Sequence, residues 1–280
     1  MTDSTRFAKV LKTPEVIALA FGAMIGWSWV LLTGVWLTAA GTVGTLIAFA
    51  VGGLAVTLIG LTYSELASAM PKAGGEHIYT ERALGSRWSF VCTWALLFSY
   101  VNVCMFEAVA LPSAVEYLYP DIRLGTLWNV LGSDVDLGFI LIGIAATALV
   151  TWVNYLGIRT AAMLQAVVTI VIIGTGILLV TGAIAFGDIN NAQPWIATPV
   201  SGILIVLIMV PSMLVGFDVI PQSAEEIDLP PNKIGRLLVF SVACAVAWYI
   251  LIAMAVGFGL TADALSTTKM ATADAAAALW

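Results

Sequence analysis

The sequence predicts an all-α polytopic membrane protein, on three observations. Hydrophobic residues make up 61% of the 280 residues, charged residues only 10%, and the mean hydropathy is +1.02. Soluble domains are about 45–50% apolar and about 25% charged. A soluble domain of this length could not bury as many apolar side chains as this sequence contains. The apolar residues also gather in runs of about 20, which is the length of one helical membrane crossing.

Seven such runs follow one another, at residues 15–40, 44–69, 88–118, 137–157, 160–186, 201–228 and 236–260. Helix-start residues precede the first run. We expect Thr13 to cap the helix with its side chain, Pro14 to take the first helical position and Glu15 to lie in the first turn. After the seventh run, residues 261–280 form a short Ala-rich segment that we expect outside the membrane.

The basic residues predict the orientation of the chain. With the N-terminus in the cytoplasm, nine Lys and Arg residues fall on the inner side and only Arg123 and Lys269 fall outside. Such an excess marks the cytoplasmic side of membrane proteins. The opening stretch "MTDSTRFAKVLKTPEV" lacks the apolar core and cleavage site of a signal peptide. We therefore expect residues 1–14 to be a cytoplasmic tail of a plasma (inner) membrane protein.

Two runs are interrupted near their middle. The first contains "GAMIGWSW" (22–29), and the sixth contains "MVPSMLVGFDVIPQSAEEIDLPP" (209–231). Aligning Gly26 with Gly216 gives the order small, aromatic, polar in both, and the two segments are 190 residues and five spans apart. They therefore cross the membrane in opposite directions. Discontinuous helices at matching positions of two inverted halves are typical of secondary transporters with a midplane substrate site. Glycines that only permit close helix packing are the alternative explanation.

Three motifs resemble the amino acid–polyamine–organocation superfamily of permeases. "GAMIGWSW" resembles its GxxIGxGIF element, "YSELASAMPKAGGEHIYTERALG" (63–85) its YAELxxxxPxxGGxYxYxxxxxG loop, and "GFDVIPQSAEEIDLPPNKIG" (216–235) its GFDxxxxxxEExxNPxxxxPxG segment. The resemblance implies a LeuT-like fold with a 5+5 inverted repeat. Residues 15–186 would then form the first repeat with spans 1–5, and residues 187–260 part of the second with spans 6 and 7. We therefore expect the chain to be the N-terminal portion of such a permease, with spans 1 and 6 discontinuous.

An amino acid substrate needs opposite partners at its two ends. Its carboxylate requires unpaired N–H groups at a helix N-terminus, which we expect from Gly26, Trp27 and Ser28. Its ammonium requires carbonyl groups or an acid, and the candidates are Ala23, Met24, Val215, Gly216 and Asp218.

Other residues are candidates for the pocket, for ion coupling or for gating. Glu107 is an ionisable residue deep in the third run, where such residues are costly, and Asn102 lies about one turn away as its possible partner. The remaining pocket candidates are the aromatic residues Trp29 and Phe217. The gate candidates are Tyr79, Glu81, Arg82, Glu225 and Glu226, the last two with Lys233 or Arg236 as possible ion-pair partners.

Where some proton-coupled members of the superfamily carry a Lys in span five, this chain has Ile172. This departure argues against a Lys-based proton mechanism. The coupling ion, H⁺ or Na⁺, stays open.

The sequence argues against several other classes of protein. The only histidine is His77 in a loop, so a Ser–His hydrolase or a paired metal site within the membrane is not supported. We expect no enzyme activity, no catalytic residue, no cofactor, no metal and no nucleic-acid partner. The expected function is a permease for an amino acid in a lipid bilayer. The alternatives are an amine or polyamine permease and a substrate sensor on the same fold.

Overall fold

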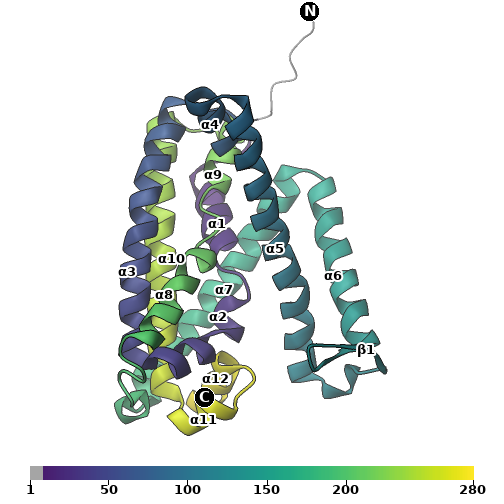
Figure 1. Ribbon diagram of the computed structural model, residues 1–280, viewed down its shortest axis with the longest axis vertical. Coiled ribbons are helices and arrows are strands. Elements are labelled where there is room, and N and C mark those ends of the chain that lie inside the picture. Colours follow the sequence, from purple (N-terminus) through teal and green to yellow (C-terminus); the bar gives the residue numbers. More distant parts are fainter. Residues whose placement is uncertain (1–8) are drawn as a thin grey trace, which may run out of the picture.

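The computed structural model describes residues 9–280, and most of them are helical (Figure 1). The helices are α1 (Thr13–Met24), α2 (Ser28–Leu31), α3 (Thr33–Ala69), α4 (Glu76–Leu84), α5 (Ser86–Leu118), α6 (Leu137–Tyr155), α7 (Ile158–Phe186), α8 (Ser201–Met213), α9 (Val219–Gln222), α10 (Pro231–Gly259), α11 (Ala262–Thr267) and α12 (Ala271–Leu279). Short 3₁₀ turns occur at Pro120–Ile122, Ile189–Ala192 and Ala224–Glu226. Residues 1–8, including Arg6 of the predicted tail, lie outside the described residues.

Five of these helices, α3, α5, α6, α7 and α10, are long and apolar enough to cross a membrane. The chain is thus an integral membrane protein. The first and sixth predicted runs correspond instead to pairs of shorter helices, α1 with α2 and α8 with α9. One departure from the all-α prediction is an antiparallel hairpin of β1 (Thr126–Val130) and β2 (Ser133–Asp136) between α5 and α6.

The predicted division between the first two runs falls inside α3. Gly41 there has φ +74° and ψ 172°, a backbone conformation that is easy only for glycine. The connection before α8 packs at this point, because Ala197 N–H donates to Ala40 O at 3.0 Å and Val43 N–H donates to Trp195 O at 2.8 Å. The chain therefore bends at Gly41, and α3 continues on both sides of this kink.

The start of α1 differs from the prediction. Thr13 is the first helical residue and not the cap. Lys12 precedes it, and the Lys12 N–H donates to Glu15 Oε2 at 3.2 Å. The segment just before α1 is hydrogen-bonded to the end of the sixth run, where Leu11 forms a parallel bridge with Ile227.

Glycines let the central helices pack closely. α3 packs against α8 and α10, while α1 lies against α7 and α10. A Cβ atom at Gly52 would come within 2.7 Å of Val210, and one at Gly53 within 2.6 Å of Val246. Small residues at such contacts allow helix backbones in a membrane to approach. α5 and α6 stand to one side of this bundle (Figure 1).

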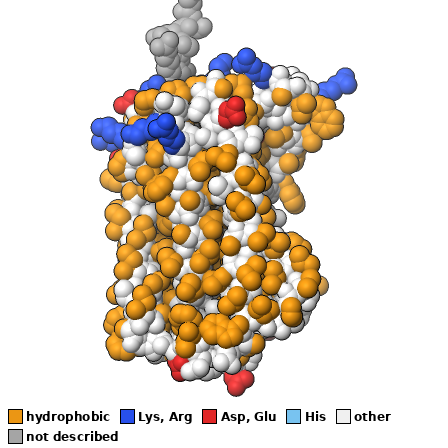
Figure 2. All heavy atoms as spheres, turned by 90° about the vertical axis from the view of Figure 1, so that its left-hand side faces the viewer, with side chains coloured by type: hydrophobic (Ala, Val, Ile, Leu, Met, Phe, Trp, Pro, Cys, Tyr) orange, Lys and Arg blue, Asp and Glu red, His pale blue; other side chains and the backbone are white. Residues whose placement is uncertain are grey.

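The surface also fits a membrane protein. Apolar side chains cover most of the face drawn in Figure 2, while Lys and Arg side chains gather at the end that carries α4. The opposite end is covered by α11 and α12 (Figure 1).

A candidate site where two helix breaks meet

The two interrupted segments touch each other. α1 ends at Met24 and α2 begins at Ser28, while α8 ends at Met213 and α9 begins at Val219. Gly216 in the second gap has φ +121°, and a Cβ atom there would lie 2.8 Å from the carbonyl carbon and oxygen of Ala23. Non-helical backbone within a membrane needs protein or a water-filled cavity around it. The two breaks supply part of that environment for each other.

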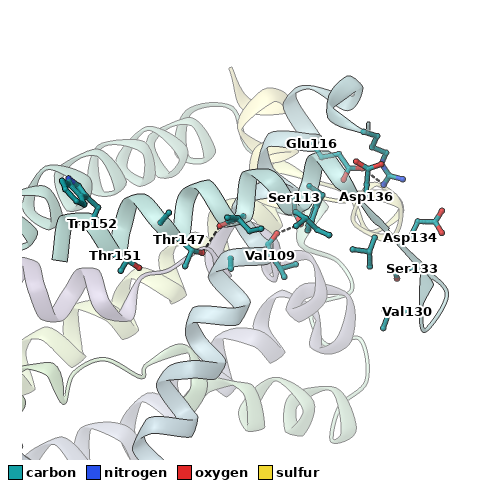
Figure 3. Close-up of a pocket in the computed structure, with 18 of the residues that line it drawn as sticks. Val109, Ser113, Glu116, Val130, Ser133, Asp134, Asp136, Thr147, Thr151 and Trp152 are labelled. Atoms are coloured by element: carbon teal, nitrogen blue, oxygen red, sulfur yellow. Dashed lines mark hydrogen bonds and ion pairs between the residues drawn. The ribbon is translucent and has the colours of Figure 1, made fainter. Parts of the chain in front are cut away.

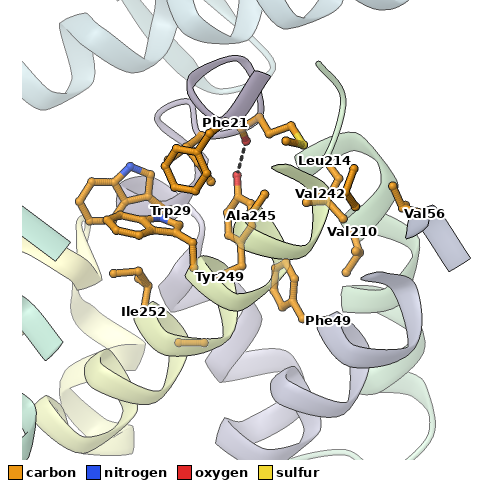
Figure 4. Close-up of a cluster of buried hydrophobic side chains, with 14 of the residues drawn as sticks. Phe21, Trp29, Phe49, Val56, Val210, Leu214, Val242, Ala245, Tyr249 and Ile252 are labelled. Carbon is orange, nitrogen blue, oxygen red and sulfur yellow. Dashed lines mark hydrogen bonds between the residues drawn. The ribbon is translucent and has the colours of Figure 1, made fainter. Parts of the chain in front are cut away.

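Tyr249 of α10 contacts the residues that border both breaks, and its side chain lies within the buried cluster of Figure 4. Its hydroxyl donates a hydrogen bond to Met24 O at 2.9 Å and lies 3.3 Å from Met213 O. A further hydrogen bond of 2.9 Å joins it to the Ser28 hydroxyl. The side chain is fully buried and stacks on Phe49. Sequence reasoning missed Tyr249, although a hydroxyl within the apolar run 236–260 was a usable sign.

A cavity of about 290 Å³ lies between the breaks and α5. Its lining includes seven residues that the sequence predicted for the site or the pocket: Ala23, Met24, Gly26, Ser28, Asn102, Glu107 and Val215. Most of the other lining side chains are apolar. The cavity is therefore a small, mainly apolar chamber edged by broken backbone.

Glu107 reaches from α5 to the break between α1 and α2. Both carboxylate oxygens lie near the Trp27 N–H, at 3.2 and 3.3 Å. A Cβ atom at Gly26 would come within 2.1 Å of Glu107 Oε1, so only glycine leaves room for this carboxylate. Asn102, a possible partner of Glu107 by sequence, is exposed and forms no side-chain hydrogen bond within residues 9–280.

Five other candidates, with Trp27 and Gly216 among them, lie outside the 290 Å³ cavity. Phe217 packs edge-on against Tyr63. Trp29 packs against Trp248 with ring centroids 5.5 Å apart. Asp218 is buried, and its Oδ1 accepts the Gly216 N–H at 3.1 Å.

A chain of polar side chains leads from Asp218 to α4. Asp218 Oδ2 accepts the Tyr100 hydroxyl and lies 3.1 Å from Gln222 Nε2. Gln222 Nε2 also lies 2.7 Å from the Tyr100 hydroxyl and 3.4 Å from Glu76 Oε2. Only 4% of Glu76 is exposed, and its Oε1 has no partner among the described residues. Burial, assisted by the charge of Asp218, raises the Glu76 pKa to about 7.

The Glu76→Gln variant is expected to have a flatter pH profile of stability than the wild type. The folded protein holds the Glu76 proton between pH 4.5, the ordinary pKa, and about 7, whereas the unfolded chain releases it. The contribution of Glu76 to the wild-type free energy of unfolding therefore falls as pH rises through this window, by at most about 3 kcal/mol, and is constant above it. Melting temperatures of both proteins from pH 4 to 9 test this.

The exposed residue Glu81, on the same helix, provides the control for this prediction. Glu81→Gln should keep the wild-type slope. Equal slopes for wild type and Glu76→Gln would contradict the prediction. The other titratable groups that interact with Glu76 are Asp218, Tyr63, Tyr79 and Tyr100, and all of them are retained in both variants.

The predicted gate residues lie at the α4 end of the molecule. Tyr79 is buried, and burial together with the nearby Glu76 raises its pKa to about 12. Glu81, Arg82 and Glu225 line a surface hollow of about 600 Å³. Of the possible ion pairs of Glu225 and Glu226 with Lys233, Arg236 or the loop at 76–82, none forms within the described part of the chain. Among residues 9–280 the sole ion pair joins Arg123 and Glu116, at 2.6 Å.

The largest hollow, about 1520 Å³, lies elsewhere, between α5, α6 and the β-hairpin (Figure 3). It is open and mainly apolar, and neither helix break lines it. Apolar walls that open sideways between two membrane helices suit lipid chains. We therefore assign the candidate substrate site to the smaller cavity.

Comparison with known proteins gives one family match and several distant relatives. A family model described as amino acid permease matches residues 11–279. The branched-chain amino acid permease BcaP of Bacillus subtilis is 26% identical over 241 residues, covering 84% of this chain and 52% of that protein. The methylthioribose transporter of the same organism is 22% identical, covering 90% of this chain and 56% of that protein. Human cationic amino acid transporter 4 is 25% identical, covering 90% and 41%. The chain spans about half the length of the curated relatives it matches.

Proposed function

Because the chain belongs to the amino acid permease family, we propose that it carries the substrate site of a secondary transporter that moves amino acids by alternating access. The observation that carries this proposal is the contact between Gly216 and Ala23, which brings two backbone breaks to one cavity. Family membership implies a LeuT-like fold and no enzyme activity. In that fold residues 15–186 would form the first repeat and residues 187–260 part of the second.

The amino acid would lie across the two breaks. Its carboxylate would face the backbone N–H groups of Gly26 and Ser28, and its ammonium the carbonyl groups of Ala23 and Val215, all at the cavity. Met24 O is less suited to the ammonium because it already accepts the Tyr249 hydroxyl. Asp218 would act at the break and not as a direct ligand, since it does not line the cavity.

Alternating access requires a contact that opens on each side of the site. On the side of α4 we assign the opening contact to the hydrogen-bond network that runs from Asp218 through Tyr100 and Gln222 to Glu76. On the other side, α12 covers α2, where the Thr272 hydroxyl donates to Trp29 O at 2.6 Å.

The gathering of Lys and Arg side chains at the α4 end supports a cytoplasmic location for that end in a plasma membrane. Residues 261–280 would then lie outside. Ile172 lines a second cavity beside Gly26, so the proposal uses no lysine for proton coupling.

Ligand binding to the purified chain tests the proposed function. A panel of amino acids and amines is screened by thermal shift, and at least one of them should raise the melting temperature. Gly26→Leu should weaken that effect at least tenfold, because its side chain would collide with Glu107. Gly174→Leu is the control, since a Cβ atom at Gly174 meets nothing within 4 Å. If no amino acid stabilises the chain, the proposed amino acid function is wrong, and stabilisation by amines alone would favour an amine permease.

A second candidate, an amine permease, is favoured by one specific observation, the position of Glu107.

A further inference from the structure

A carboxylate of the protein already occupies the place expected for the substrate carboxylate. Both oxygens of Glu107 lie within 3.3 Å of the Trp27 N–H, and Oε1 fills the space beside Gly26. Glu107 belongs to α5, 80 residues further along the chain, so the contact depends on the tertiary fold. Of the three N–H groups expected to bind a substrate anion, the middle one is thus engaged by the protein itself.

The surroundings supply no positive charge to offset a second carboxylate. Glu107 lines both the 290 Å³ cavity and the neighbouring cavity of about 590 Å³ between α1, α5, α6 and α7. Within the part of the chain that the structure describes, no Lys, Arg or His lines either cavity, and Glu107 is the only acid that does. A zwitterion would place its carboxylate against Glu107, and two carboxylates this close cannot both stay ionised in a poorly hydrated site without a cation beside them.

The helix that follows the break adds little attraction for an anion. α2 has four residues, and the dipole of so short a helix is small. A cation in the same position would meet the Glu107 carboxylate and the carbonyl groups at the ends of α1 and α8. The charge of the cavity therefore matches a cationic occupant.

We propose that Glu107 takes the part of the substrate carboxylate, and that the substrate is a small monoamine cation without a free carboxylate. The ammonium lies beside Glu107, and an apolar chain of a few carbons packs on Leu32, Val103, Phe106 and Met213 in the 290 Å³ cavity. This inference rests on the second candidate function, an amine permease built on the same cavity, and names its substrate class.

Matched compounds test the inference on the wild-type chain. Leucine, leucinamide and 3-methylbutylamine share one side chain but differ in the group at the carboxylate position, and phenylalanine, phenylalaninamide and phenethylamine form a second set. Calorimetric titrations should show that the amine and the amide of at least one set bind at least tenfold more tightly than the amino acid. An amino acid that binds as tightly as its amine would overturn the inference and leave the proposed function standing. No binding by any of the six compounds, or by the wider panel, would reject both.

Two variants of α5 identify the residue responsible. Glu107→Gln keeps the shape of the side chain and a hydrogen-bond acceptor for Trp27, but removes the charge. We expect it to weaken amine binding at least tenfold and to leave amino acid binding unchanged or stronger. Glu116→Gln, on the same helix but away from both cavities, should leave all affinities unchanged. Unaltered amine binding in Glu107→Gln would exclude Glu107 as the selecting residue. If Glu107→Gln does not fold, the wild-type comparison still decides the substrate class.

Discussion

Replacing Gly216 by alanine is expected to abolish ligand binding and to lower stability by roughly 2–6 kcal/mol. Two costs add at this position. The φ of +121° is strained for any residue with a Cβ atom. The new methyl group would also lie 2.8 Å from backbone atoms of Ala23, which cannot move aside as the end of a side chain can. The two breaks would have to separate, and the cavity between them would lose its shape.

Thermal melting and titration of Gly216→Ala with the best ligand of the wild type measure both effects. Gly174→Ala is the matched control, because Gly174 lies within α7 and has open space at its Cβ position. It should bind normally and be as stable as the wild type or slightly more so, since alanine favours a helix over glycine. A Gly216→Ala chain with wild-type affinity would show that the contact between the breaks does not shape the site.

Both interrupted segments carry a local signal in the sequence. Gly26 lies near the middle of the first apolar run and Gly216 near that of the sixth, and such residues weaken a helix wherever they occur. The alignment of the two segments also brought Ala23 and Gly216 into one predicted site, and the structure places them in contact. Membrane insertion followed from composition alone.

The partners of the site residues could not be predicted in the same way. Glu107 stood out as an acid within an apolar run, but its contact with Trp27 depends on how α5 leans on α1. Tyr100 and Gln222 are 122 residues apart, and nothing in either segment indicates the other. Side-chain networks between helices depend on helix rotation and depth, which a single sequence does not determine.

Boundaries failed where tertiary contacts override local preference. α3 begins at Thr33, inside the first predicted run, and its bend at Gly41 depends on the packing of Trp195 and Ala197. The hairpin at residues 126–136 is a short exposed connection without the alternating apolar pattern of a buried strand. The bend at Gly41 thus depends on contacts with a distant segment of the chain. The hairpin leaves no periodic pattern in the sequence by which it could be predicted.

The second large effect is expected from Tyr249→Phe, which removes one oxygen atom from the core. That oxygen contacts Met24 O, Met213 O and the Ser28 hydroxyl, so its loss leaves buried polar groups without their partner. An unpaired buried polar group costs about 1–3 kcal/mol. The melting temperature should fall by roughly 2–4 °C for each kcal/mol. Ligand affinity should fall as well, because Met24 and Ser28 lie on either side of the first break and both line the cavity. Tyr155→Phe is the control, since Tyr155 is 82% exposed.

A double-mutant cycle with Ser28→Ala shows whether Tyr249 acts through the break. If the Tyr249 hydroxyl stabilises the fold mainly by holding Ser28, the double variant should lose clearly less stability than the sum of the single variants, because one hydrogen bond joins the two side chains. Strict additivity would mean that the Met24 and Met213 carbonyl groups account for the whole effect of Tyr249. An unchanged melting temperature and an unchanged affinity in Tyr249→Phe would show that the Tyr249 hydroxyl has no role in the site. The contact between Gly216 and Ala23 would then have to hold the two breaks together without it.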